Sequence, residues 1–167
     1  MAILFRLPHL MLLALCTLAT TAFSQDSKDA PVTALEQTLK VLPREVLGGL
    51  RTSKRDAAAL EGTGLLQEKV QGRTATLKLK MERVEKDPSR DDKLDRFRIK
   101  AEDTRANEGG VPFVIHLWVH CAATESEKIK ALRKGQTVTV TGKITLASIT
   151  VHNPNKIQID LSEATLE

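Results

Sequence analysis

Cysteine and aromatic residues are scarce in this 167-residue chain. It contains two cysteines, four phenylalanines, one tryptophan and no tyrosine. No nucleophile, general base and orienting acid stand out as a set, so we expect a non-catalytic protein without a cofactor. Charge is also close to balance, with 25 basic and 21 acidic residues. The resulting net charge of +4 does not by itself indicate a polyanionic partner.

The first 24 residues have the pattern of a secretory signal peptide. Arg6 and the amino terminus give a positive start, residues 10–19 form a short apolar run, and residues 22–24 (AFS) place small side chains before a cut at Gln25. We therefore expect export to the periplasm or the extracellular medium, with no transmembrane segment after cleavage. The alternatives are a buried N-terminal helix and a lipoprotein signal acylated at Cys16, which the bulky preceding Leu15 disfavours.

Cleavage would remove Cys16 and leave Cys121 as the single cysteine of the mature chain. An internal disulfide is then excluded, even in an oxidising compartment. Cys121 lies at an apolar position of an alternating segment, so we expect a small buried hydrophobic side chain. The alternatives are an intermolecular bridge and a reactive thiol.

Residues 25–64 are expected to form a leader and short helices at the periphery of the fold. Residues 25–32 are mostly polar, which is typical of a flexible segment. Thr33 and Glu36 have the spacing of a helix capping box. A second helix is expected to start near Ser53 and to stop at Gly62.

Residues 65–167 are expected to form the main domain, because apolar residues there recur with the period of two that is typical of strands. Residues 73–81, 95–102 and 112–121 alternate in this way, as do residues 136–146 and 156–166. The alternation slips by one at Arg83–Val84, which indicates a β-bulge. Gly142 interrupts the fourth segment where a strand can bend sharply.

A helix is expected between the third and fourth strands. Thr124 with Glu127 has capping-box spacing, Ile129 and Leu132 share a face, and Gly135 marks the end. The expected order of elements is three strands, then a helix, then two strands. This is the order of the five-stranded Greek-key barrel called the OB-fold. The main alternative is an open α+β sheet built from the same strands.

Three phrases of this domain resemble an OB-fold family labelled tRNA-anti-like. They are LLQEKVQGRTATLKLKMERVE at 65–85, FVIHLWVHCAA from 113 onward, and LRKGQTVTVTGKI at 132–144. The resemblance covers roughly residues 60–167. It implies an OB-fold and, through distant kinship with anticodon-binding domains, nucleic-acid binding; many members carry signal peptides.

The outer face of the first three strands is the candidate ligand surface, because OB-folds usually bind ligands there. Its alternate residues include the single tryptophan and several cations. They are Lys78, Lys80, Arg96, Arg98, Lys100, His116, Trp118 and His120. A tryptophan beside cations suits a ligand with stacked rings and anionic groups.

We therefore expect an exported, non-catalytic OB-fold binding protein whose partner is an anionic oligomer, either nucleic acid or an acidic glycan. The alternative is a protein–protein interaction or structural module of the cell envelope. A competing interpretation of Trp118 is structural: the indole would pack against Leu39, Leu42 or Leu60 of the N-terminal helices, or simply stay exposed.

Metal binding is not expected. His116 and His120 lie roughly 13 Å apart on a strand that rises about 3.3 Å per residue, too far to share an ion bound at about 2 Å. Asp91, Asp92 and Asp95 lack the ligand spacing and the glycine of a calcium loop. They are expected to form a solvated loop.

Overall fold

The computed structural model describes residues 30–87 and 96–167. The expected signal peptide and the loop with Asp91, Asp92 and Asp95 lie outside these residues. Within them, no helix has the length and apolar character needed to cross a membrane.

The described residues form a mainly β structure with six strands in one sheet. The strands are β1 (Thr74–Lys86), β2 (Phe97–Ala101), β3 (Thr104–Glu108), β4 (Val111–Cys121), β5 (Thr137–Thr150) and β6 (Asn155–Leu166). The sheet order is β2-β1-β5-β6-β4-β3, and an additional β2–β4 pairing closes a five-stranded barrel. This confirms the expected OB-fold-like barrel and excludes the open sheet.

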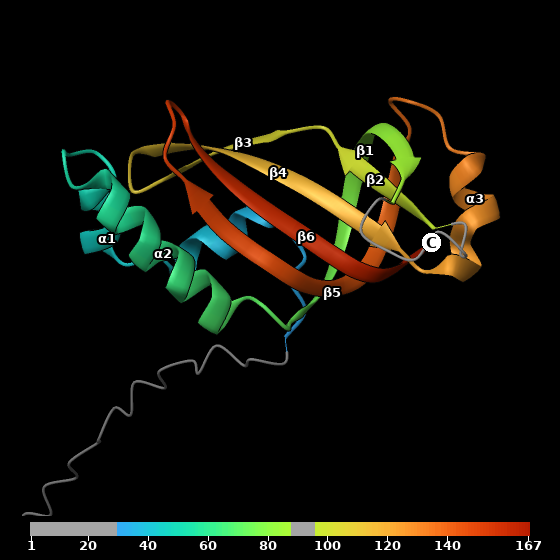
Figure 1. Cartoon of the computed structure of the whole chain (residues 1–167), viewed down its shortest axis with the longest axis horizontal. Coiled ribbons are helices and arrows are strands. Elements are labelled where there is room, and N and C mark those ends of the chain that lie inside the picture. The colour runs from blue at the N-terminus through green and yellow to red at the C-terminus, as the bar shows by residue number, and fades with distance from the viewer. Residues whose placement is uncertain (1–29, 88–95) are drawn as a thin grey trace, which may run out of the picture.

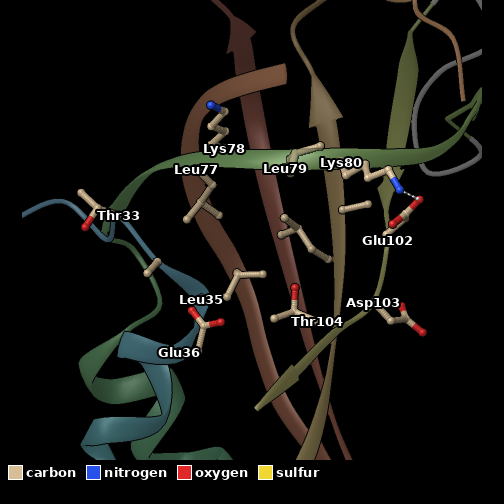
Figure 2. Close-up of a pocket in the computed structure, with 13 residues that line it drawn as sticks. Thr33, Leu35, Glu36, Leu77, Lys78, Leu79, Lys80, Glu102, Asp103 and Thr104 are labelled. Atoms are coloured by element: carbon tan, nitrogen blue, oxygen red, sulfur yellow. Dashed lines mark ion pairs between the residues drawn. The ribbon is translucent and has the colours of Figure 1, made fainter. Parts of the chain in front are cut away.

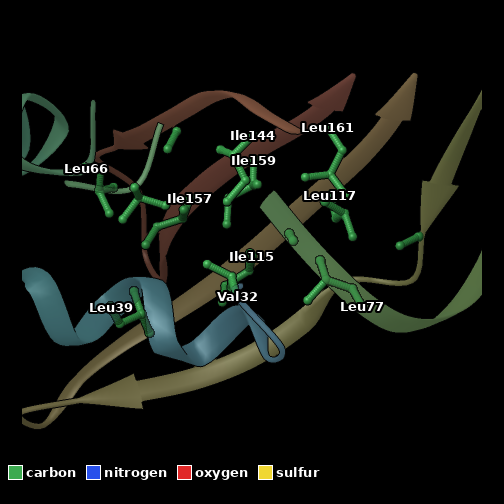
Figure 3. Packing of buried hydrophobic residues seen from close by; sticks show 14 of the residues in the cluster. Val32, Leu39, Leu66, Leu77, Ile115, Leu117, Ile144, Ile157, Ile159 and Leu161 are labelled. Carbon is green, nitrogen blue, oxygen red and sulfur yellow. The ribbon is translucent and has the colours of Figure 1, made fainter. Parts of the chain in front are cut away.

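Alternation along β4 places one set of side chains inside the barrel and the other set outside. Phe113, Ile115 and Leu117 are buried, whereas Val114 and Trp118 are only partly buried. Figure 3 shows Ile115 and Leu117 among buried side chains from the neighbouring strands and from the N-terminal helices. The expected direction of the indole, outward from the barrel wall, is confirmed.

The strand β3 was not expected, because only Ala106 supplies an apolar residue to the segment Thr104–Glu108. It pairs with the first half of β4 through a turn at Gly109 and Gly110, which have φ angles of 53° and 77°. β2 pairs with the second half of β4. The second barrel strand is therefore split in two at residues 102–103.

A register shift lies between Met81 and Arg83 in the pairing of β1 with β2, close to the expected bulge. An extra residue on one strand reverses which alternate side chains face outward. Lys78 and Lys80 are exposed before the shift, whereas Arg83 and Glu85 share the outward face of Lys100 and Arg98 after it.

Five helices complete the fold of the described residues. They are η1 (Leu35–Val41), α1 (Arg44–Gly49), α2 (Arg55–Lys69), η2 (Ala123–Glu125) and α3 (Ser126–Lys130). Figure 1 shows α1 and α2 at one end of the barrel and α3 at the other. The expected helix between the third and fourth barrel strands is thus present, although it ends at Lys130 rather than near Gly135.

The prediction that the N-terminal helices are peripheral is wrong, because Leu39 and Leu66 are buried in the same core as the barrel interior. The stop at Gly62 is also wrong, since α2 continues to Lys69 and crosses the expected boundary after residue 64. A Cβ at Gly62 would lie 2.7 Å from Cδ1 of Ile149. This glycine therefore serves close packing of α2 on β5 instead of ending the helix.

Side-chain caps also differ from expectation. Thr124 and Glu127 form no capping box; the Ser126 hydroxyl instead donates to the Ala123 carbonyl at 2.8 Å. Thr33 bonds with Gln37, not with Glu36. The capping-box spacing located both helical regions but predicted the wrong hydrogen bonds. The reason is that η1 is a 3-10 helix over its whole length, and the 3-10 helix η2 directly precedes α3.

Gly142 marks a second bulge, where the register of β5 against β6 shifts. An added Cβ would lie 3.0 Å from Cβ of Ala164 and 3.1 Å from the Ser162 carbonyl oxygen.

We expect Gly142→Val to lower the free energy of unfolding by about 1–3 kcal/mol in urea denaturation, because the strands must separate locally. Gly64→Val is the control, since its Cβ would meet no atom within 4 Å. An equal loss in both variants would contradict this role of Gly142.

Candidate binding surface on the outer face of the barrel

The side chain of Trp118 lies beneath three cations. The Arg98 guanidinium carbon is 4.1 Å from the ring centroid, the Arg83 carbon 5.3 Å and the Lys100 ammonium 5.9 Å. Cations over an indole face are attracted by its quadrupole. We call Trp118, Arg83, Arg98 and Lys100 the Trp118 cluster.

The helical residues proposed as partners of Trp118 lie elsewhere. Leu39 and Leu42 are buried in the hydrophobic core, on the side of the sheet that Trp118 faces away from. Leu60 is 76% exposed, so no indole covers it. The interpretation that the indole packs against Leu39, Leu42 or Leu60 is therefore wrong, and the cations of β1 and β2 lie over the ring instead.

Strand register explains how the Trp118 cluster assembles. Lys100 pairs with Trp118 across β2 and β4, and it pairs with Arg83 across β1 and β2. Cross-strand partners share one face of a sheet, so the three side chains converge. Arg83 and Glu85 were not among the predicted site residues. The slip in alternation at Arg83–Val84 was the available signal, because it reverses the direction of every residue after it.

Carboxylates neutralise the arginines of the cluster. Arg98 Nε donates to Glu85 at 2.7 Å, and Arg83 bonds Glu82 at 2.8 Å and Glu85 at 3.4 Å. Partial burial acts to raise the pKa of Glu85, but the hydrogen bonds and charges of Arg98 and Arg83 hold it below its ordinary value. The arginines therefore face a carboxylate that stays ionised.

Lys100 shares Glu82 with Arg83, at 3.6 Å, and is held mainly at the split between β2 and β3. Its side chain is only 8% exposed, and its ammonium donates to the Ala101 carbonyl at 3.0 Å and to Asp103. Asp103 also bonds Nδ1 of His116 at 2.8 Å. Burial acts to raise the pKa of Asp103, but the bond and charge of Lys100, with a smaller effect of His116, lower it.

His120 lies between two carboxylates at the end of the face. Its Nδ1 is 2.7 Å from Asp87, whose side chain is 1% exposed, and its Nε2 is 3.8 Å from Asp160. Asp160, then Asp87, raise the pKa of His120 against the opposing effect of burial. The protonated imidazole is thus stabilised by charges from β6 and from the end of β1.

The structure brings together five of the predicted site residues and separates three. Arg98, Lys100, His116, Trp118 and His120 share the outer face of β2 and β4. Arg96 pairs with Glu163 of β6 at 3.2 Å. Lys80 pairs with Glu102 at 3.0 Å, and Lys78 lies opposite Thr139 of β5, away from the indole.

Two further observations concern metal binding and the single cysteine of the described residues. In residues 30–87 and 96–167, no three histidine, cysteine or acidic side chains gather as a possible metal site. Cys121 is buried, and desolvation with the nearby Glu125 and Asp87 raises its pKa to about 12. The thiol therefore stays protonated and is a poor nucleophile.

Comparisons of the chain with family models, curated proteins and solved structures found no significant match. The geometry of this surface is therefore the basis for proposing a role.

Proposed function

We propose that this protein is an exported, non-catalytic OB-fold module of the cell envelope that binds another protein. One observation carries the proposal: the predicted cations other than Lys78 are already paired with carboxylates of this chain. Arg98, Lys100, Lys80 and Arg96 each have an acidic partner. A protein gains affinity for a polyanion when its cations neutralise phosphates and release the counterions condensed on them, and cations already paired with carboxylates offer little of that gain.

Charge balance is compatible with protein binding. Interfaces between proteins combine apolar contacts with polar groups whose charges are matched, and they do not need a field of one sign. The N-terminal pattern of residues 1–24 supports a location in the periplasm or outside the cell. We propose no catalytic residue and no cofactor.

The second candidate is an anionic oligomer, either nucleic acid or an acidic glycan, bound at the Trp118 cluster. It is favoured by the Arg98 guanidinium stacked 4.1 Å from the indole centroid, since both groups can stack on rings. The resemblance to the tRNA-anti-like family also supports it. Such a ligand would have to displace Glu82 and Glu85 from the arginines.

Fluorescence of Trp118, the single tryptophan, distinguishes the two candidates. We expect titration of the mature protein with single-stranded oligonucleotides and with acidic oligosaccharides at low salt to give no saturable change. We also expect a fixed envelope protein to co-purify. A saturable change that disappears at high salt, and that Arg98→Gln abolishes, would instead establish the second candidate.

A further inference from the structure

The first half of β1 and the strand β3 do not pair with each other, although the β2–β4 pairing closes the barrel. β1 pairs with β2 only from Met81 onward, and β3 is the last strand of the sheet order, paired with β4 alone. Between β1 and β3 lies a groove of about 330 Å³, bordered by residues 33–36 on its third side. Figure 2 shows β1 along one side, with Leu35 and Glu36 facing Thr104 and Asp103 across the gap. We call it the β1 groove.

Among the described residues, the groove-side backbone of β1 lacks a strand partner at Lys78. Thr76 N–H donates to the Val32 carbonyl at 2.9 Å, so the polar backbone groups of Thr76 point away from β5 and toward the groove. Alternate residues of a strand direct these groups to the same edge. Lys78 therefore presents its N–H and C=O to the groove, and neither has a backbone partner there among the described residues.

The unpaired stretch is bounded at both ends. Val32 forms a parallel bridge to Ala75 at one end, and Glu102 N–H donates to the Lys80 carbonyl at 2.8 Å at the other. The molecule thus already adds one extended piece of its own chain to this edge. The space between the two contacts suits an extended segment that continues the pairing at Lys78.

The groove offers an apolar floor and the cation of Lys78, while Glu36, Glu102 and Asp103 add carboxylates to its border. Leu77 and Leu117, both buried side chains of the barrel interior, form part of its lining. Lys78 is exposed and has no carboxylate partner among the described residues, unlike the other predicted cations. A peptide strand would place alternate side chains toward the leucines and toward Lys78.

We propose that the β1 groove binds an extended peptide segment of a partner protein by strand addition to β1 at Lys78. The segment carries an apolar side chain that faces Leu77 and Leu117, next to an acidic one that pairs with Lys78. Main-chain hydrogen bonds supply affinity and the alternate side chains supply specificity in this type of recognition. The inference rests on the proposed role in protein binding and specifies its site.

A proline at position 78 tests the site selectively. The N–H that proline removes points into the groove, so Lys78→Pro leaves the ladder between β1 and β5 intact. Lys78→Gln is the matched control, because it keeps the N–H and removes only the charge. The probe is a panel of fluorescein-labelled heptapeptides with alternating valine and either glutamate or lysine, measured by anisotropy against the mature protein.

We expect the valine–glutamate peptide to bind, Lys78→Pro to weaken it at least tenfold and Lys78→Gln to weaken it about threefold. The valine–lysine peptide is expected to bind more weakly than the valine–glutamate peptide. In hydrogen exchange followed by NMR, the backbone amide hydrogen of Lys78 should exchange faster than those of Leu77 and Leu79 in the free protein. Its exchange should become slower when the peptide binds. Equal binding by wild type and Lys78→Pro, or slow exchange of Lys78 without peptide, overturns the inference.

The outcome also separates the site from the proposed function. If an envelope protein co-purifies equally with wild type and Lys78→Pro, the function stands and the β1 groove is not its site. If neither the peptides nor any fixed protein binds, both proposals fail.

Discussion

Replacing Ile115 with alanine is expected to lower the free energy of unfolding by about 2–5 kcal/mol. Ile115 is fully buried at 0% exposure, in the middle of β4 and among side chains from both the barrel and the N-terminal helices. Removal of its branched side chain leaves a cavity that close-packed neighbours fill only in part. Urea denaturation followed by Trp118 fluorescence measures the loss.

Val114→Ala is the matched control, because it truncates the adjacent β-branched residue on the opposite face of the same strand. Val114 is only partly buried and faces outward. We expect its loss to stay near 0.5 kcal/mol, the range of substitutions away from the core. If both variants lose similar stability, the inward and outward assignment of β4, and with it the position of Trp118, is incorrect.

Replacing His120 with phenylalanine is expected to lower the free energy of unfolding by about 1.5–3 kcal/mol at pH 6, the range for hydrogen bonds to charged groups. The variant keeps a ring of similar shape on β4 and loses the nitrogen atoms that face Asp160 and Asp87. Asp87 is almost fully buried, so the loss of an interaction there is costly.

The pH dependence of this effect has a defined sign. The pKa of His120 is raised in the folded protein above its ordinary value of 6.5, chiefly by Asp160 and then by Asp87. The stability contributed by the imidazolium is therefore fully present below pH 6.5 and is lost as the pH rises through the folded pKa. We expect the difference between wild type and His120→Phe to be smaller at pH 9 than at pH 6.

His152→Phe controls for the removal of a histidine as such. This residue is exposed in the turn between β5 and β6, and its replacement is expected to change stability by no more than about 0.5 kcal/mol. A His120→Phe effect that is equal at pH 6 and pH 9 would show that the ion pairs with Asp87 and Asp160 do not stabilise the fold.

The predictions for individual elements show which kind of information the sequence carried. Period-two alternation identified β1, β2, β4, β5 and β6 and the inward face of each, because one buried face imposes a local pattern on a strand. β3 was missed because it contains a single apolar residue, Ala106. It is a strand only because the turn at Gly109 and Gly110 returns the chain along β4.

In the N-terminal helices, a local sequence signal gave a wrong prediction. Gly62 was interpreted as a helix stop, since glycine has low helix propensity. Packing overrides that preference here, because α2 must approach β5 closely at Ile149. Nothing in the local sequence records that approach.

The sequence by itself determined the barrel strands, the helix between the third and fourth of them, and the outward direction of Trp118. These features follow from side-chain alternation and from turn residues, which act over a few neighbouring positions. Only the tertiary structure decided that Arg83 joins Arg98 over the indole, that acidic residues neutralise these cations, and that β1 keeps an open edge at Lys78. Strand register and a bulge bring together residues far apart in the chain, and charge pairing depends on that distance in space rather than on order in sequence.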